Sequence, residues 1–234
     1  MDRFYAFGCS FTNYKYSTWA DILAHGRPHF ENWGQQGAGN HFIFNSVMEC
    51  DQRNHFREGD LVMICWTNST REDRYLDQWI TPGNVLTSDI YTKKFAVEQV
   101  TQRGSLIRDL AMIKAVKVLL ESRGCCWQFL SMVPLSNAEQ FSGESAGIEN
   151  VLDLYKDVID SVSDSYLEVI YNNQWGSRTN HNNHPLPKDH LEYLERVTEF
   201  KISEDTRAFV DKEDTLVREQ GKITKHGICK HQRL

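Results

Sequence analysis

The sequence predicts an α/β fold, in which helices pack on both faces of a five-stranded, mainly parallel sheet to give a three-layer α/β/α sandwich. Two observations indicate this class. Five short apolar runs alternate along the chain with segments of helical periodicity, which is typical of α/β proteins. Three of the runs are apolar throughout, as at residues 61–66, and this pattern suits parallel strands that are covered on both faces.

The five expected strands are runs rich in apolar and aromatic residues. In chain order they are Arg3–Gly8, Phe30–Trp33, Asp60–Trp66, Cys125–Met132 and Tyr166–Tyr171. Polar segments follow the first three of them. The carboxyl ends of parallel strands are where α/β sheets hold their ligands, so these segments are candidates for a functional site.

The expected helices occupy the remaining periodic stretches. One begins at Trp19, and the others span Asn40–Asp51, Phe95–Ser122, Asn150–Val162, Pro187–Phe200 and Glu204–Glu219. Thr18 and Asp21 have the spacing of a capping box, and Pro187 suits a first helical turn. Apolar residues recur at helical spacing in the longest helix; they are Leu106, Leu110, Ile113 and Leu120.

The chain is predicted to form one α/β domain over residues 1–200. Residues 67–91 make a long polar and aromatic connection within it, which we expect to be a lid-like insertion. Residues 201–234 carry charges of both signs and are expected to form a C-terminal extension, a helix followed by a mobile tail.

Composition excludes several classes of protein. The 26 basic and 32 acidic residues give a net charge of −6, so we expect no nucleic-acid partner, which usually requires a basic domain. No apolar run reaches the ~18 residues of a membrane-spanning helix, and the N-terminus lacks a secretory signal. We therefore expect a cytoplasmic protein, or one associated with a virion if a phage encodes it.

The six cysteines contain no C-x-x-C pair, so most are expected to pack as small apolar residues.

Four polar segments carry the candidate chemistry. Ser10 follows the first strand, within Gly8-Cys9-Ser10-Phe11-Thr12, and three glycines follow the second strand within residues 32–40. Asn68 follows the third strand, where its amide can donate to an oxyanion. His184 ends a polar loop ahead of the Pro187 helix. Each segment alone also fits a structural role, such as a turn, a flexible loop or a helix cap.

The order of these segments resembles the SGNH/GDSL hydrolase superfamily, over roughly residues 1–200. Residues 8–12 resemble its first block, residues 32–37 its second, residues 66–68 its third, and His184-Pro185 its last. The Gly-Cys-Ser-Phe-Thr form of the first block is similar to phage and environmental members.

The resemblance implies a flavodoxin-like three-layer fold and a serine esterase or deacylase that needs no cofactor. Ser10 would be the nucleophile, and His184 would exchange its proton. The N–H groups of Ser10 and Gly37 and the side chain of Asn68 would form the oxyanion hole. The reaction would pass through an acyl-serine intermediate and release an alcohol and a carboxylic acid. The substrate would be a small-molecule ester or a glycan ester.

The sequence departs from the family where an acid normally precedes the histidine. His181 and Asn182 stand there, and the Asn182 carbonyl could orient the imidazole as in Cys-His-Asn sites. A Ser–His dyad, a distant acid such as Asp189, and loss of activity are the alternatives. Cys9 is a second potential nucleophile, although adjacent residues in a turn generally point apart.

Neighbouring residues suggest what the site would bind. Arg71 would bind a polar or anionic substrate, or else begin a solvated helix. Trp66 replaces a family glycine and, with Tyr75 and Trp79, could stack on a sugar ring or simply pack as part of a lid.

Metal binding is a separate reading, which we do not favour. His181, His184 and His190 lie within a short span, but no Cys or Glu completes a zinc pattern. The tail residues His226, Cys229 and His231 invite the same reading.

Two other functions remain open on the same residues. An acyltransferase would pass the acyl group to a sugar hydroxyl, and a catalytically degenerate relative would be a binding or structural phage-like protein. Nucleotide binding is disfavoured because no G-x-G-x-x-G follows the first strand. We make no prediction of the oligomeric state.

Overall fold

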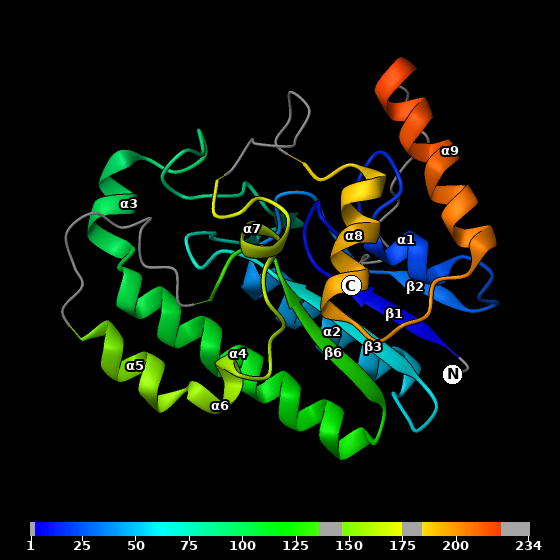
Figure 1. Cartoon of the computed structure of the whole chain (residues 1–234). Helices are drawn as coiled ribbons and strands as arrows, with labels where there is room; N and C mark the ends of the chain where they lie inside the picture. Colours follow the sequence, from blue (N-terminus) through cyan, green and yellow to red (C-terminus); the bar gives the residue numbers. More distant parts are fainter. Residues whose placement is uncertain (1–2, 136–146, 175–183, 221–234) are drawn as a thin grey trace.

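The computed structural model describes residues 3–135, 147–174 and 184–220, and its centre is a parallel sheet (Figure 1). The strands are β1 (Phe4–Phe7), β2 (Phe30–Asn32), β3 (Leu61–Trp66) and β6 (Cys126–Ser131), in the order β2-β1-β3-β6. All three pairings are parallel. The structure therefore confirms the α/β class and the first four expected strands.

The sheet has a switch point between β1 and β3. From β1 the chain moves to β2 on one side, and then returns to β3 on the other side. Ligands of open α/β sheets bind at the carboxyl ends of the strands at such a point. The segments that follow β1 and β3 contain Ser10 and Asn68.

The prediction of a fifth strand at Tyr166–Tyr171 is wrong. This run forms the short helix α7 (Tyr166–Val169), because Ser165 and Glu168 make a capping box. Ser165 N donates to Glu168 Oε2 at 2.8 Å and Glu168 N donates to Ser165 Oγ at 3.3 Å, and this reciprocal pairing favours a helical start over an extended chain. Among the described residues, a single parallel bridge between Phe129 and Val162 lies beside β6, and the main sheet that they form has four strands.

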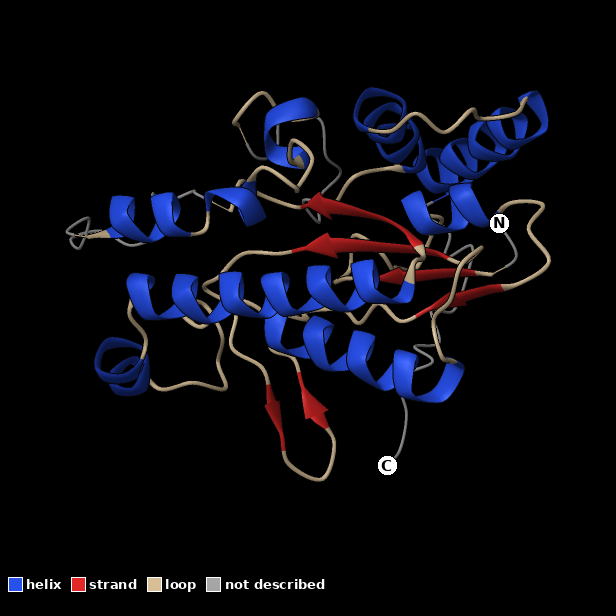
Figure 2. Ribbon diagram, turned by 90° about the horizontal axis from the view of Figure 1, so that it is seen from below, coloured by secondary structure: helices blue, strands red, loops and turns tan. Residues whose placement is uncertain are grey.

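Helices cover both faces of the sheet (Figures 1 and 2). One face carries α1 (Trp19–Ala24) and α8 (Pro187–Val197), with α9 (Glu204–Gln220) packed on α8. The other face carries α2 (Asn40–Asn54) and α4 (Gln102–Arg123). The capping box at Thr18 is present, and the predicted apolar stripe of α4 is buried.

The single long helix expected at Phe95–Ser122 is divided into α3 (Lys93–Gln99) and α4. The break falls at two β-branched residues, Val100 and Thr101, which are extended. The Thr101 hydroxyl accepts the Gly104 N–H at 3.1 Å, so it caps α4 instead of continuing α3. The helix expected at Asn150–Val162 is likewise divided, into α5 (Ile148–Leu154) and α6 (Lys156–Ile159).

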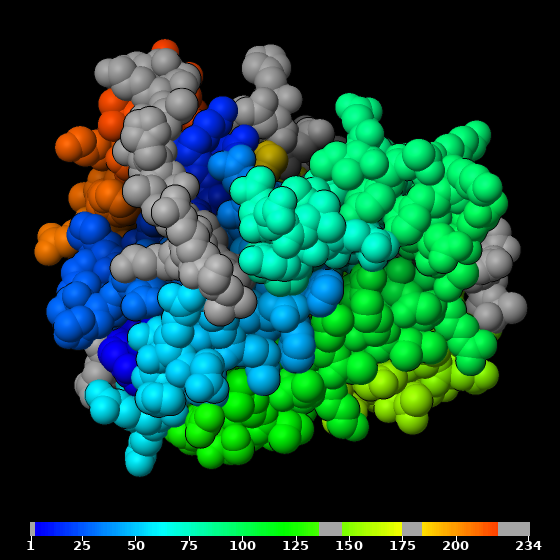
Figure 3. All heavy atoms as spheres, turned by 180° about the vertical axis from the view of Figure 1, so that it is seen from behind, coloured from blue at the N-terminus to red at the C-terminus, as the bar shows by residue number. Residues whose placement is uncertain are grey.

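Residues 67–91 include an antiparallel hairpin, β4 (Arg74–Tyr75) and β5 (Trp79–Ile80). The hairpin projects away from the main sheet (Figure 2), and Figure 3 shows this part of the chain, in turquoise to green, as a raised region of the surface. The base of the segment is fixed, because Val85 N donates to Thr70 O at 2.9 Å and Thr81 Oγ1 to Gln36 O at 2.9 Å.

The apolar core runs continuously through both helical layers. Four described cysteines, Cys9, Cys50, Cys65 and Cys125, are buried and free, and Cys126 is exposed. None of the described helices combines the length and apolar character needed to cross a bilayer.

Candidate active site

Ser10 and His184 lie together at the carboxyl edge of the sheet. The distance from Ser10 Oγ to His184 Nε2 is 2.9 Å, within the range over which a general base takes a proton. Gly8 makes the turn before Ser10 with φ +154°, and a Cβ there would lie 2.1 Å from Thr12 Oγ1. Only glycine therefore allows the chain to leave β1 and present Ser10 in this way.

The Ser10 turn is fixed to the segment that follows β2. Asn32 Nδ2 donates to Thr12 O at 2.8 Å, and Asn13 Nδ2 donates to Gly34 O at 2.9 Å. Gln35 N donates to Gly8 O at 3.0 Å. These bonds cross between two strand ends, so they hold the serine in register with the glycine-rich segment.

His184 stands just ahead of α8, and aromatic rings hold its imidazole. The Tyr14 ring is stacked on it, with ring centroids 4.2 Å apart and planes 6° apart. The Phe11 ring packs against the imidazole in a tilted arrangement, with ring centroids 5.7 Å apart. The imidazole is thus fixed in a plane that directs Nε2 at Ser10.

The predicted orienting groups have different outcomes. His181 and Asn182 lie outside the described residues, as do His226, Cys229 and His231 of the tail. Asp189 is buried and its Oδ2 accepts the Leu186 N–H at 2.8 Å, so this carboxyl caps the start of α8. His190 is buried as well, and its Nδ1 lies 2.7 Å from the Tyr166 hydroxyl.

Asn68 is oriented as a hydrogen-bond donor. Its Oδ1 accepts from both the N–H and the hydroxyl of Thr70, each at 2.7 Å. Because the Thr70 N–H can only donate, the atom of the Asn68 carboxamide that faces Thr70 must be the oxygen. The amide nitrogen, Nδ2, therefore points away from Thr70. The family resemblance expects this Nδ2 to donate to an oxyanion.

Gly37 and Gly34 occupy different places in the glycine-rich segment. Gly37 has φ +76°, and a Cβ on it would lie 2.1 Å from Thr81 O, so it packs beneath the 67–91 segment. Gly34 packs against the Ser10 turn, where a Cβ would lie 2.9 Å from Asn13 Cβ. Gly34 of the second block therefore packs against the nucleophile turn, whereas the resemblance assigned the oxyanion role to Gly37.

Trp66 and Arg71 were predicted to contact substrate. Trp66 is fully buried and packs edge-on against Phe129, so it offers no ring face for stacking, and that prediction is corrected. Arg71 Nη1 donates to Ala38 O at 2.8 Å, which ties the guanidinium to the glycine-rich segment instead of to a solvated helix start.

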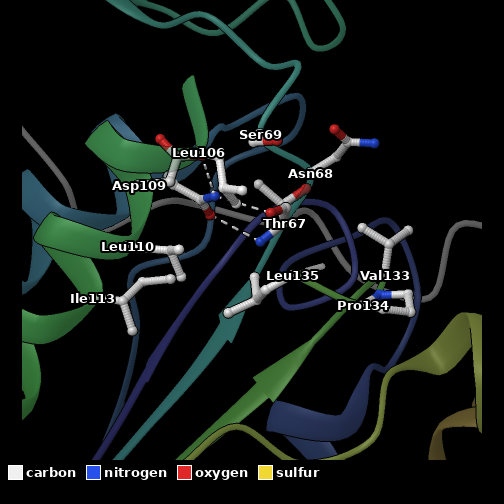
Figure 4. A pocket seen from close by; sticks show the side chains of 11 residues that line it. Thr67, Asn68, Ser69, Leu106, Asp109, Leu110, Ile113, Val133, Pro134 and Leu135 are labelled. Atoms are coloured by element: carbon white, nitrogen blue, oxygen red, sulfur yellow. Dashed lines mark hydrogen bonds between the residues drawn. The ribbon is translucent and has the colours of Figure 1, made fainter. Parts of the chain in front are cut away.

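Asn40 joins two segments of the site and was not predicted. Its Nδ2 donates to Thr67 O at 2.9 Å and to Asp109 Oδ2 at 2.7 Å, and its Oδ1 accepts the Thr67 N–H at 2.9 Å. Both backbone groups of the residue before Asn68 are thus held by one side chain. Figure 4 shows Thr67 and Asp109 in this network, with the carboxamide of Asn68 directed away from it. An aspartate on the apolar stripe of a helix is the sequence signal that could have revealed it.

Asp73 fixes the start of α2. Its two carboxylate oxygens accept the Gly39 N–H at 2.9 and 3.0 Å, and Oδ2 also accepts the Phe42 N–H at 2.9 Å. Burial raises the pKa of Asp73, while the two N–H donors oppose that rise. A carboxylate from the 67–91 segment therefore takes the capping role that the Gly39 side chain cannot supply.

A small cavity adjoins Asn68 (Figure 4). Its volume is about 10 Å³. Apolar side chains from α4 and from the segment after β6 form much of its wall; they are Leu106, Leu110, Ile113, Val133, Pro134 and Leu135. Space of this size accommodates about one water-sized group.

Comparison with known proteins finds several similar solved structures. No protein-family model matches the chain, and no curated protein matches it. A candidate acylhydrolase from Bacteroides fragilis is similar with a TM-score of 0.47 and 13% identity, over 89% of this chain and 88% of that one. The protein YxiM from Bacillus subtilis is similar with a TM-score of 0.42 and 14% identity, over 94% of this chain and 57% of that one.

Asp109 gives the fold a testable pH dependence. Burial is the largest cause that raises the pKa of Asp109 from 3.8 to about 6, and Arg108 and Asn40 oppose it. The folded state therefore binds more protons than the unfolded state between about pH 4 and pH 6. The stabilising contribution is full below this window and is lost as the pH rises through about 6.

Asp109→Asn should remove this contribution. The free energy of unfolding of the wild-type protein, minus that of the variant, is expected to increase by up to about 3 kcal/mol as the pH falls from 7 to 4. Urea unfolding at several pH values measures the difference. Asp77→Asn, at an exposed hairpin residue, should leave the profile unchanged. A flat difference for Asp109→Asn would show that this carboxyl does not titrate in the window.

Proposed function

We propose that the protein is a serine hydrolase of acyl esters. The observation that carries the proposal is the 2.9 Å approach of Ser10 Oγ to His184 Nε2 at the switch point of a parallel sheet. The order of the four sequence blocks supports it independently. The same geometry favours an active enzyme over a degenerate relative, because a hydroxyl and an imidazole at this distance form a nucleophile and its base.

The reaction follows from the positions of these groups. His184 Nε2 takes the Ser10 proton as Oγ attacks the ester carbonyl, and the carbonyl oxygen becomes an oxyanion. Asn68 Nδ2 and the backbone N–H groups of the Ser10 turn and the glycine-rich segment stabilise that oxyanion. His184 then gives the proton to the leaving alkoxide, and water attacks the acyl-serine by the same steps in reverse order.

The proposal does not extend to a carbohydrate alcohol. Trp66 is in the core, and Trp79 packs edge-on against His41 and Phe42. Tyr75 is the remaining ring of the three, at 49% exposure. One exposed ring is too little to assign a sugar platform, so the substrate class is an acyl ester.

A fluorophosphonate probe tests the proposal. The probe should form a covalent adduct on Ser10, because only a serine with an adjacent base attacks phosphorus readily. Peptide mass mapping locates the adduct. Cys9→Ala is the matched control for the neighbouring nucleophile and should label equally well. A Ser10 peptide without adduct at high probe concentration would reject the enzyme and favour a binding or structural protein.

A further inference from the structure

The Tyr14 ring is stacked on the imidazole of His184. The two rings are nearly parallel, 6° apart, with centroids 4.2 Å apart. The tyrosine is only 8% exposed, so water is largely kept from the shared face. A cation on the face of an aromatic ring is attracted by the ring quadrupole, and more strongly when it is desolvated.

The Tyr14 ring is itself held in place from the side of the C-terminal helices. It packs edge-on against Tyr16, with centroids 4.8 Å apart. Both tyrosines form a small apolar cluster with Leu186, which precedes α8, and Val217 of α9. The plane of the ring is therefore set by packing before His184 gains or loses a proton.

The chemistry assigns this contact a role. When His184 takes the Ser10 proton it becomes an imidazolium, and in the resembling family an acid near the histidine stabilises that charge. His181 and Asn182, neither of them acidic, stand at those positions. A stacked ring supplies both of the functions that such an acid has, since it fixes the plane of the imidazole and favours its charged form.

We propose that Tyr14 is a positioning residue that orients His184 and stabilises its protonated form through the stacked ring face. The inference rests on the proposed function, in which His184 is the general base. The physical claim concerns the imidazole alone, so it can be measured without any substrate.

Other charges near His184 must be held constant in the test. Lys15 Nζ lies 5.6 Å from the centroid of the Tyr14 ring, so its charge must stay the same in every variant. The titratable and charged groups on the elements packed around the imidazole include Lys15 and Tyr16 on the loop after β1, Tyr166 on α7, Lys188, Asp189 and His190 on α8, and Asp214 and Arg218 on α9. Replacing Tyr14 by an uncharged residue alters none of them.

The experiment is an NMR titration of the His184 ring in the full chain, with the signal assigned from a His184→Gln spectrum. Tyr14→Leu keeps an apolar side chain but removes the ring face, and the pKa of His184 should fall by about half a unit to one and a half units. Tyr14→Phe keeps the ring and should stay close to the wild-type value. An unchanged or higher pKa in Tyr14→Leu would overturn the proposal.

A second measurement covers the case in which Tyr14→Leu does not fold. Fluorinated phenylalanines at position 14 keep the shape of the ring and weaken its quadrupole, so the pKa of His184 should fall with each added fluorine. A pKa that is independent of fluorination would reject the cation–π contact. A clear shift in a protein that hydrolyses no ester would keep the role of Tyr14 and reject the proposed function, and ester turnover without a shift would do the reverse.

Discussion

Replacing Ser10 with alanine is expected to reduce the hydrolysis of a short-chain nitrophenyl ester by about 10³-fold or more. The hydroxyl is the attacking group in the proposed reaction, so without it only the binding and oxyanion groups remain to assist water. The value of kcat/KM, measured with the wild-type protein and the variant at equal concentration, gives the effect directly.

A matched control separates loss of the nucleophile from loss of the fold. Ser17 is a buried serine on the same loop, and its hydroxyl donates to Glu213 Oε2 at 2.9 Å, so it belongs to the contact with α9. Ser17→Ala should retain most of the turnover. Equal rates in Ser10→Ala and the wild-type protein would discard Ser10 as the nucleophile.

Replacing His184 with alanine is expected to reduce kcat/KM by about 10³- to 10⁴-fold. The serine would then keep its proton at neutral pH. The acid limb of the pH–rate profile, which reports protonation of the free base, should disappear from the residual activity. Stopped assays between pH 5 and pH 9 measure both effects.

The double variant provides the sharper test. Ser10 and His184 act as one unit, so Ser10→Ala/His184→Ala should be no slower than Ser10→Ala alone. His25→Ala is the matched control, because that imidazole stacks on Phe209 and its Nδ1 contacts the Thr206 hydroxyl. Effects of Ser10 and His184 that multiply in the double variant would mean that they contribute independently.

Strong local patterns explain why most of the fold could be predicted. The strands β1 and β3 are runs buried from end to end, and the stripe of α4 has an unbroken helical period. The errors occurred where a side-chain cap competes with the general pattern. Ser165 and Glu168 turn an apolar run into a helix, and Thr101 divides what otherwise resembles one long helix.

The site was predictable where it depends on residue order and obscure where it depends on contacts between distant segments. Ser10 and His184 were selected from short blocks, and the structure brings them together. Asn40 acts on the backbone of Thr67, a neighbour only in space, so no local pattern indicates it. Trp66 was misplaced because its burial depends on tertiary packing and not on its own sequence block.

Val217 of α9 packs in one apolar cluster with Tyr14. The C-terminal helix therefore supports a ring of the loop after β1, far away along the chain. A truncation at residue 200 would follow the compositional boundary of the sequence and still expose the back of Tyr14 to solvent. Under the proposed role of that ring, the imidazole of His184 would be poorly oriented in such a shortened protein. Assays of the shortened protein would therefore not represent the full chain.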